Sequence, residues 1–387
     1  MKTKRIFLIV MDSFGIGGAA DAERFGDRGS DTLRSLMATP RFDTPNLGKL
    51  GLYHIDGVQP RPEESEPIGA YARLAEMSEG KDSTIGHWEI AGIYADEPLP
   101  TYPKGFPDEI IREIEKRTGR PVLCNKAYSG TEVIKVYGEE HKKTGGLIVY
   151  TSVDSVMQIA AHMDVMPMEE LYRCCTIARE VLSGEHCVGR VIARPFNGEY
   201  PYKRIAGRHD YSATPPKTTV LDLLKQNGLD TIAVGKINDI FAGVGISEAY
   251  GTSSNEEGMK TASALQEKDF QGLCFINFVD FDTVYGHRRN AEGYARAVMN
   301  LDRWLGDFMK NMRDDDILMI TADHGCDPGY AGTDHTRENV PLLMYGKTIQ
   351  PKNLGKRASF SDIAATIADI FDIPYSLNGE SFFAEVH

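Results

Sequence analysis

The sequence is poor in cysteine, has no long apolar run and carries no excess of basic residues. Only six of its 387 residues are cysteines, and none follows a C-x-x-C spacing, so we expect reduced thiols rather than a disulfide framework. No run approaches the ~18 apolar residues of a membrane span. The apolar run at residues 6–11 is shorter than the core of a secretory signal. We therefore expect a cytoplasmic protein without a membrane partner.

The net charge is −13 at pH 7, from 43 basic and 56 acidic residues. This balance argues against a chain built to coat nucleic acid. It still permits an anionic substrate, because a phosphate pocket is local, and an acidic excess suits a divalent metal ion. We expect a small-molecule substrate, no nucleic acid and no obligatory protein partner.

Strand-like and helix-like segments alternate along both ends of the chain. Short apolar runs followed by Asp or Gly predict buried strands at residues 6–11, 230–237, 273–279 and 316–322. Periodicity and stop signals predict helices at residues 220–226, 291–313 and 362–371, the last with Ser361 as its N-cap. The alternation indicates an α/β fold with a mostly parallel sheet flanked by helices, and such sheets bind ligands beyond the carboxyl ends of their strands.

The middle of the chain reads as a separate, smaller α/β domain. Prolines punctuate it at positions 98, 100, 103 and 107 and again at 215 and 216, and the chain length favours two domains. We predict helices near residues 108–118 and 169–182 and strands near residues 146–151 and 188–194. The predicted organisation is a discontinuous core domain, residues 1–98 and 215–387, with residues 99–214 inserted into it.

Asp and His residues gather where the predicted strands end. A lone Asp after a strand is usually a turn or cap residue, but three Asp–His motifs between residues 282 and 335 indicate a site. Carboxylates and imidazoles together suit a divalent ion such as Mn²⁺ or Zn²⁺. The candidate ligands are Asp12, Asp282, His287, Asp323, His324 and His335.

Residues 80–89, GKDSTIGHWE, are the candidate source of a nucleophile. Gly, Asp and Ser together predict a loop, in which Gly86 allows an unusual backbone and Ser83 can N-cap the next segment. A capping loop alone would explain these residues. Beside two metal ions, however, a coordinated hydroxyl becomes a nucleophile, and ions ~4 Å apart can hold attacking and leaving oxygens in line.

Nine motifs run in order along the whole chain. They are VMDSFGIG at 10–17, GKDSTIGHWE at 80–89, YTSVDSVMQIAAH at 150–162, GRVIARPF at 189–196, GRHDYS at 207–212, VGKINDIF at 234–241, VDFDTVYGHRR at 279–289, TADHG at 321–325 and GTDHTRENVPLL at 332–343. Together they resemble the phosphopentomutase family of the alkaline phosphatase superfamily. The resemblance implies an alkaline-phosphatase-like core with an inserted cap domain.

The same resemblance implies an isomerase, an intramolecular phosphotransferase that uses a phosphorylated enzyme. Its expected reaction interconverts α-D-ribose 1-phosphate and D-ribose 5-phosphate, and the corresponding 2-deoxyribose phosphates, in nucleoside salvage. Mn²⁺ is the expected metal, and a sugar bisphosphate such as glucose 1,6-bisphosphate is the expected activator.

The resemblance also implies the roles of the site residues. Asp282, His287 and His335 match the ligands of one ion, and Asp12, Asp323 and His324 match those of the other. The nucleophile position matches Ser83, four residues before His87. Many relatives have Thr there, so this chain departs from the commoner pattern and Thr84 is the second choice. Cys326 stands where the family's DHGND has Asn, and no ligand is lost by that departure.

For the inserted domain the resemblance implies a cap that closes over the sugar phosphate. Ser152 and Asp154 are candidates for holding the sugar hydroxyls. The candidates for the distal phosphate are basic, because guanidinium groups match phosphate oxygens; they are Arg190, Arg194, Arg208 and Lys236. Each of these four would equally fit a surface or interface salt bridge.

Other functions compete with a phosphopentomutase. A sulfatase needs Pro two residues and Arg four residues after its nucleophile, where this chain has Ile85 and His87. A cofactor-independent phosphoglycerate mutase shares the Ser–His spacing but is a much longer chain. A metal-dependent phosphatase or phosphodiesterase shares the metal ligands, and motif spacing leaves it open. A non-catalytic metal-binding protein is disfavoured, because every candidate ligand is intact.

Overall fold

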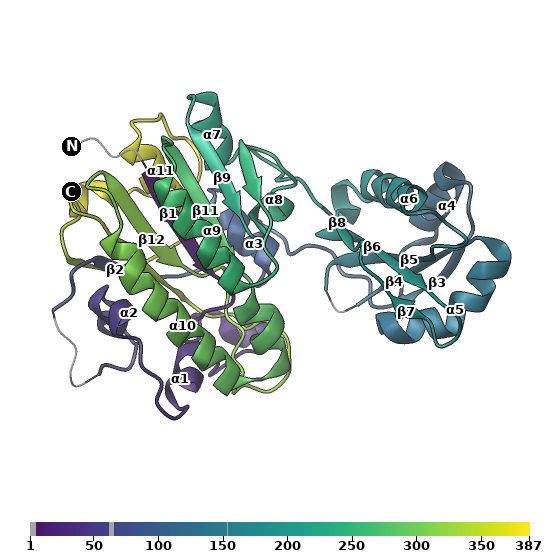
Figure 1. The fold of residues 1–387 in the computed structure, drawn as a ribbon, viewed down its shortest axis with the longest axis horizontal. Helices are drawn as coiled ribbons and strands as arrows, with labels where there is room; N and C mark the ends of the chain where they lie inside the picture. The colour runs from purple at the N-terminus through teal and green to yellow at the C-terminus, as the bar shows by residue number, and fades with distance from the viewer. Residues whose placement is uncertain (1–4, 62–65, 153) are drawn as a thin grey trace. The chain divides into compact units, whose positions relative to one another are not determined.

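The computed structural model describes residues 5–61, 66–152 and 154–387, and the chain divides into two compact units (Figure 1). One unit joins Met1–Pro98 to Pro215–His387, and the other is Leu99–Thr214. We call them the core unit and the insert. All six cysteines have free thiols. None of the helices in the described ranges has both the length and the apolar character needed to cross a bilayer.

An eight-stranded sheet forms the centre of the core unit. β13 runs antiparallel to both of its neighbours, and the other neighbouring pairs are parallel. The central strand β1 is buried along its whole length, as expected for a strand covered on both faces. In spatial order the strands are β10 (Glu248–Tyr250), β9 (Asp230–Val234), β11 (Gly272–Phe278), β1 (Arg5–Met11), β12 (Asp316–Thr321), β13 (Val340–Tyr345), β2 (Ala70–Leu74) and β14 (Lys352–Arg357).

Helices cover both faces of this sheet (Figure 1). On one face lie α9 (Asn255–Glu267) and α10 (Ala291–Lys310); on the other lie α3 (Ser83–Ile90), α7 (Val220–Gln226), α8 (Ile237–Ile240) and α11 (Asp362–Ile370). The short helices α1 (Thr32–Met37), α2 (Pro45–Lys49) and α12 (Phe383–Val386) complete the unit. The predicted α/β class, with a mostly parallel sheet flanked by helices, is confirmed.

The insert has a six-stranded mixed sheet between two apolar clusters. Its strands are β3 (Val122–Ala127), β4 (Leu147–Thr151), β5 (Val156–His162), β6 (Arg190–Asn197), β7 (Lys203–Arg204) and β8 (His209–Ser212). Successive side chains of β4 enter opposite clusters, as the pleat of a strand requires. One cluster lies under α4 (Asp108–Thr118) and α6 (Met168–Val181), and the other lies under α5 (Gly130–Thr144).

The predicted loop at residues 80–89 is wrong, because α3 begins at Ser83. Ser83 is the first helical residue and Asp82 is the N-cap, with its side chain accepting hydrogen bonds from the backbone N–H groups of Thr84 and Ile85. Gly86 serves close packing rather than an unusual backbone. A Cβ at this position would lie 2.1 Å from the carbonyl oxygen of Asp323. The glycine therefore lets α3 press against the segment that comes after β12.

Two further local predictions need correction. Ser361 is the N-cap residue of α11, as predicted, but its side chain makes no capping hydrogen bond; its hydroxyl donates to the carbonyl oxygen of Glu89 instead. The apolar run at residues 230–237 is not one strand, because β9 ends at Val234 and α8 begins at Ile237. Gly235 makes the turn between them with a φ of 76°, a conformation that costs glycine little.

Candidate metal centre and nucleophile

Six candidate ligands converge at the carboxyl ends of β1, β11 and β12. Asp12 comes directly after β1, and Asp323 and His324 come after β12. Asp282 and His287 lie on helical turns directly after β11, and His335 precedes β13. β1 pairs in parallel with both β11 and β12, so the ends of these three strands meet at one edge of the sheet.

Asp12, Asp323 and His324 form the first ligand group, which is buried. Their side chains are 0%, 0% and 1% exposed. Nε2 of His324 lies 3.5 Å from Oδ1 of Asp12 and 3.4 Å from Oδ2 of Asp323. The backbone N–H of Ser13 donates to Oδ1 of Asp323 at 3.0 Å, which leaves Oδ2 directed at the other ligands.

Asp282, His287 and His335 form the second ligand group, which is more open. Nε2 of His287 lies 3.3 Å from one Asp282 oxygen, and Nε2 of His335 lies 3.3 Å from the other. The two Nε2 atoms are 3.2 Å apart. The His287 side chain is 36% exposed and the His335 side chain 13%.

Backbone carbonyls set the orientation of all three imidazoles. Nδ1 of His287 donates to the carbonyl oxygen of Thr333 at 2.6 Å, and Nδ1 of His335 donates to that of Lys81 at 2.9 Å. Nδ1 of His324 is 3.0 Å from the carbonyl oxygen of Gly325. With the proton on Nδ1, each ring presents Nε2 as a ligand atom, which is the usual arrangement at metal sites.

Three buried carboxylate oxygens have no hydrogen-bond partner among the described residues. They are Oδ1 of Asp12, Oδ1 of Asp282 and Oδ2 of Asp323. Burying a carboxylate without compensation is costly, and a cation between these oxygens and the Nε2 atoms would satisfy them. Mixed oxygen and imidazole ligands fit Mn²⁺ or Zn²⁺. The residues present therefore fit a pair of divalent ions.

The pKa values show the same demand for positive charge. Burial alone would raise the pKa of Asp282, but His335 and His287 hold it well below its usual range. The hydrogen bond to Asp282 raises the pKa of His287 to about 9. Burial would raise the pKa of Asp323 as well, yet the neighbouring His324 and His87 lower it.

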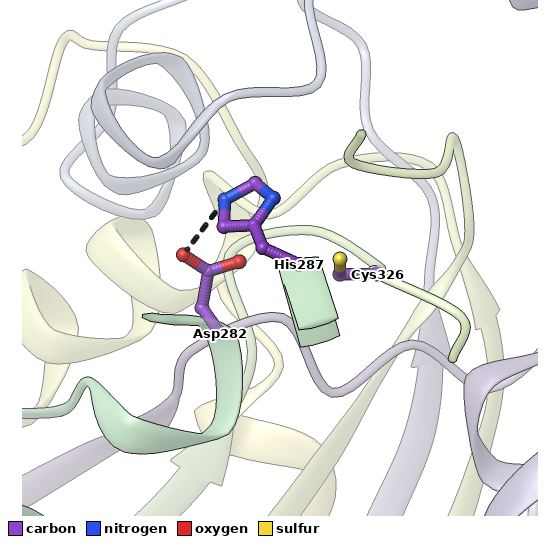
Figure 2. A group of neighbouring side chains, drawn as sticks. All are labelled: Asp282, His287 and Cys326. Atoms are coloured by element: carbon purple, nitrogen blue, oxygen red, sulfur yellow. Dashed lines mark ion pairs between the residues drawn. The ribbon is translucent and has the colours of Figure 1, made fainter. Parts of the chain in front are cut away.

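Cys326 lies beside the second ligand group, as Figure 2 shows. Its sulfur and ligand atoms of Asp282 and His287 lie within 4.8 Å of one another. Burial, followed by the neighbouring carboxylates, raises the pKa of the thiol above its usual range. The thiol contacts the carbonyl oxygen of Asp334 at 3.7 Å, so hydrogen bonding and packing account for this residue.

Ser83 faces the ligand groups from the first turn of α3. Its hydroxyl lies 3.1 Å from Nε2 of His324. Thr84, the second choice for the nucleophile, has a buried side chain that is 7% exposed. Buried Arg337 holds the segment before Ser83, because one guanidinium nitrogen donates to the carbonyl oxygens of Ser78 and Gly80 at 2.8 and 2.6 Å.

Five of the six substrate-binding candidates belong to the insert, where several are paired with each other. Arg208 makes two hydrogen bonds of 2.7 Å to Asp210, and Arg190 contacts the same carboxylate at 3.4 Å. The Ser152 hydroxyl donates to Asp154 at 3.3 Å.

Two of the basic candidates have other partners. Nε of Arg194 donates to Gln158 at 2.9 Å. Burial, followed by the charge of Arg208, lowers the pKa of Arg194 to about 10. Lys236 belongs to the core unit, and its ammonium lies 3.9 Å from Oδ2 of Asp12.

A cavity of about 430 Å³ is lined in part by Gly17 and Gly18, from the segment that comes after Asp12. Its lining includes Arg28, Arg34 and Arg73 but none of the ligand candidates. Arg34 and Arg28 are paired with carboxylates at 2.9 and 3.4 Å, and Arg73 donates to backbone carbonyls. The candidate ligands therefore lie outside this cavity.

Sequence reasoning missed the polar residues that surround the ligands. Asn277 lies near the carboxyl end of buried β11, and a polar residue inside an apolar run was the available signal. His87 stands out in the sequence only by its spacing from Ser83. Asp210 lies within one of the nine motifs, but nothing in the sequence shows that two arginines share it.

Comparison with known proteins identifies the superfamily and the family of the chain. The profile of the metalloenzyme superfamily matches residues 4–375. A phosphopentomutase of Lachnoclostridium phytofermentans is 56% identical over 385 residues, 99% of each chain. A phosphopentomutase of Caldanaerobacter subterraneus subsp. tengcongensis is 52% identical over 99% of this chain and 98% of its own. A solved Leishmania mexicana phosphoglycerate mutase covers 98% of each chain at 12% identity, with a TM-score of 0.48.

The resemblance that the nine motifs predicted is confirmed. The matches to curated relatives span nearly the whole chain at more than half identity, and those relatives are intramolecular phosphotransferases. The chain belongs to the phosphopentomutase family, within the metalloenzyme superfamily.

Proposed function

We propose that this chain interconverts α-D-ribose 1-phosphate and D-ribose 5-phosphate, and the corresponding 2-deoxyribose phosphates, with Ser83 as the phosphorylated residue. The observation that carries the proposal is the 3.1 Å approach of the Ser83 hydroxyl to His324 within a cluster of orphaned carboxylate oxygens. The name of the relatives supports the same reaction.

Asp282, His287 and His335 would hold one divalent ion, and Asp12, Asp323 and His324 the other, with Mn²⁺ as the first choice. When bound, such ions lower the pKa of a coordinated hydroxyl and neutralise charge on a transferring phosphoryl group. The local chain suits an anion at Ser83, because this residue opens α3 and the N-terminus of a helix favours negative charge.

Each half of the reaction moves one phosphoryl group. The free hydroxyl of the bound pentose phosphate attacks the phosphorus on Ser83, the P–Oγ bond breaks, and the hydroxyl proton is released. The product of this step is a pentose 1,5-bisphosphate. The Ser83 oxygen then attacks the other phosphorus, the sugar ester bond breaks, and the sugar oxygen takes up a proton. A sugar bisphosphate such as glucose 1,6-bisphosphate would load Ser83 at the start.

Recognition of the sugar is assigned to the insert, which we propose acts as a cap. Ser152 and Asp154 would hold sugar hydroxyls. Guanidinium groups suit the second phosphate because they bind two of its oxygens at once; the residues assigned to it are Arg190, Arg194 and Arg208, with Lys236 from the core unit.

The direct test is an assay with D-ribose 5-phosphate, Mn²⁺ and glucose 1,6-bisphosphate. We expect ribose 1-phosphate to appear without release of free phosphate. Stoichiometric phosphate release would instead identify a phosphatase and overturn the mutase assignment.

Ser83→Ala should lower mutase turnover by at least about 10³-fold, because removal of a nucleophile abolishes the covalent route. Metal content, measured by elemental analysis, should stay largely unchanged. Thr84→Val, which removes the neighbouring hydroxyl, is the matched control and should retain most activity. Loss of turnover in the Thr84 variant alone would move the nucleophile to Thr84.

A further inference from the structure

Asn277 is a polar residue near the carboxyl end of the buried strand β11, where it is 1% exposed. Burying an amide is costly unless its hydrogen bonds are made. Its Nδ2 group donates to Oδ2 of Asp12 at 3.0 Å and faces Nε2 of His87 at 3.3 Å. The amide nitrogen therefore serves the first ligand group and the helix that carries the nucleophile, while Oδ1 has no hydrogen-bond partner among the described residues.

The chemistry of these partners fixes the direction of each hydrogen bond. A carboxylate accepts only, so the amide nitrogen and not the amide oxygen must face Asp12. The second N–H of the same amide then faces His87, whose Nε2 must accept it. The proton of the His87 ring consequently sits on Nδ1.

His87, which contacts Asn277, also contacts Ser83 and Asp323. It is fully buried, and its Nδ1 lies 2.8 Å from the carbonyl oxygen of Ser83 and 3.2 Å from Oδ2 of Asp323. The missing side chain at Gly86 allows this approach, because α3 packs directly on the backbone of Asp323. One imidazole thus spans from the nucleophile's residue to a ligand of the same ion.

We propose that Asn277 and His87 form a positioning bridge that fixes Asp12, Asp323 and Ser83 relative to one another. The inference rests on the proposed function, since it takes these three residues to surround one ion. The bridge holds the two carboxylates at the separation that the ion requires and holds the first turn of α3 beside them. Neither residue touches the substrate.

Substitutions at His87 can distinguish the contribution of Nδ1 from that of Nε2. The amide nitrogen of Asn can take the place of Nδ1 as a donor, whereas the amide oxygen of Gln can take the place of Nε2 as the acceptor for Asn277. His87→Asn keeps the contacts of Nδ1 with Ser83 and Asp323 but loses the link to Asn277, so we expect it to weaken Mn²⁺ binding less than His87→Gln does. His87→Gln should weaken one of the two ions by about 10–100-fold, as losses of outer-shell partners do.

Asn277→Leu distinguishes a role in positioning the ligands from a role in stabilising the fold. Leucine is close to asparagine in size and adds no charge, so the metal-free protein should still fold. Affinity for one Mn²⁺ should nevertheless fall about 10–100-fold. A role limited to stabilising the fold predicts the reverse: lower stability and unchanged affinity.

The measurement is Mn²⁺ titration of the full chain by calorimetry, with electron paramagnetic resonance to detect the spin-coupled pair of ions. His141→Asn is the matched control: His141 is a fully buried histidine of the insert whose Nδ1 contacts the carbonyl oxygen of Gly146. It should bind both ions as wild type does.

If wild type binds two ions and both His87→Gln and Asn277→Leu bind them equally well, the bridge is wrong while the proposed function stands. If wild type binds fewer than two ions, both fail.

Discussion

The charged candidate residues of the core unit and of the insert differ in burial and in pairing. In the core unit, Asp12, Asp282 and Asp323 are buried and keep oxygens without hydrogen-bond partners. In the insert, Arg190 and Arg208 share Asp210 and remain partly exposed. A bound cation would offset the free-energy cost of burying unpaired carboxylates, whereas partly exposed ion pairs need no further partner. The metal centre can therefore be inferred from the core unit alone, and the substrate contacts cannot be inferred from the insert alone.

Among the substitutions that test this comparison, replacing a candidate metal ligand of the core unit should cause the largest loss of activity. Asp323→Asn removes a buried ligand, and we expect mutase activity to fall by at least about 100-fold, beyond the loss typical of outer-shell partners. Elemental analysis should show loss of one ion. Full metal content with full activity would show that Asp323 is not a ligand.

A change in the insert should act on substrate binding instead. Arg190→Met should raise KM for ribose 5-phosphate by about 10–100-fold, the worth of one hydrogen bond to a charged group, and leave the ion content unchanged. Initial-rate kinetics at saturating Mn²⁺ measure this. An unaltered KM would remove Arg190 from the binding site and leave it as a partner of Asp210.

Glu338 of the core unit should make stability depend on pH. Burial raises its pKa to about 7, although donors including Thr32 and Thr336 favour the charged form. The folded state then binds an extra proton, so wild-type stability should fall as pH rises from about 4.5 to 7. Glu338→Gln lacks this proton equilibrium, and its deficit relative to wild type should shrink by about 1–3 kcal/mol over that range. Urea unfolding in EDTA at pH 5 and pH 8 measures the difference; a constant deficit would contradict it.

Glu170 of the insert should show the opposite slope and the smallest effect. The hydrogen bond from Arg173, helped by Arg120, lowers its pKa to about 2. Its contribution to stability is present above pH ~4.5 and is lost as pH falls toward 2. Glu170→Gln should therefore cost about 0.5–1 kcal/mol at pH 7 and nothing near pH 2. An equal cost at both pH values would show that packing, not charge, is what the substitution removes.

The fold class and the clustering of the candidate ligands were predictable from the sequence because their signals are local. Most candidate ligands come shortly after an apolar run, and parallel strands bring such ends to one edge. The role of Gly86 was not predictable, since it depends on how α3 packs against the segment that follows β12. His87 and Asn277 escaped for the same reason: their partners lie far away in sequence and are set by strand register.

Phosphopeptide mapping of the full chain after reaction with glucose 1,6-bisphosphate and Mn²⁺ tests the central claim most directly. We predict one phosphoryl group per chain, located on Ser83, which disappears when ribose 5-phosphate is added and ribose 1-phosphate forms. An unmodified chain that still turns over substrate, or phosphate found on Thr84 alone, would contradict it.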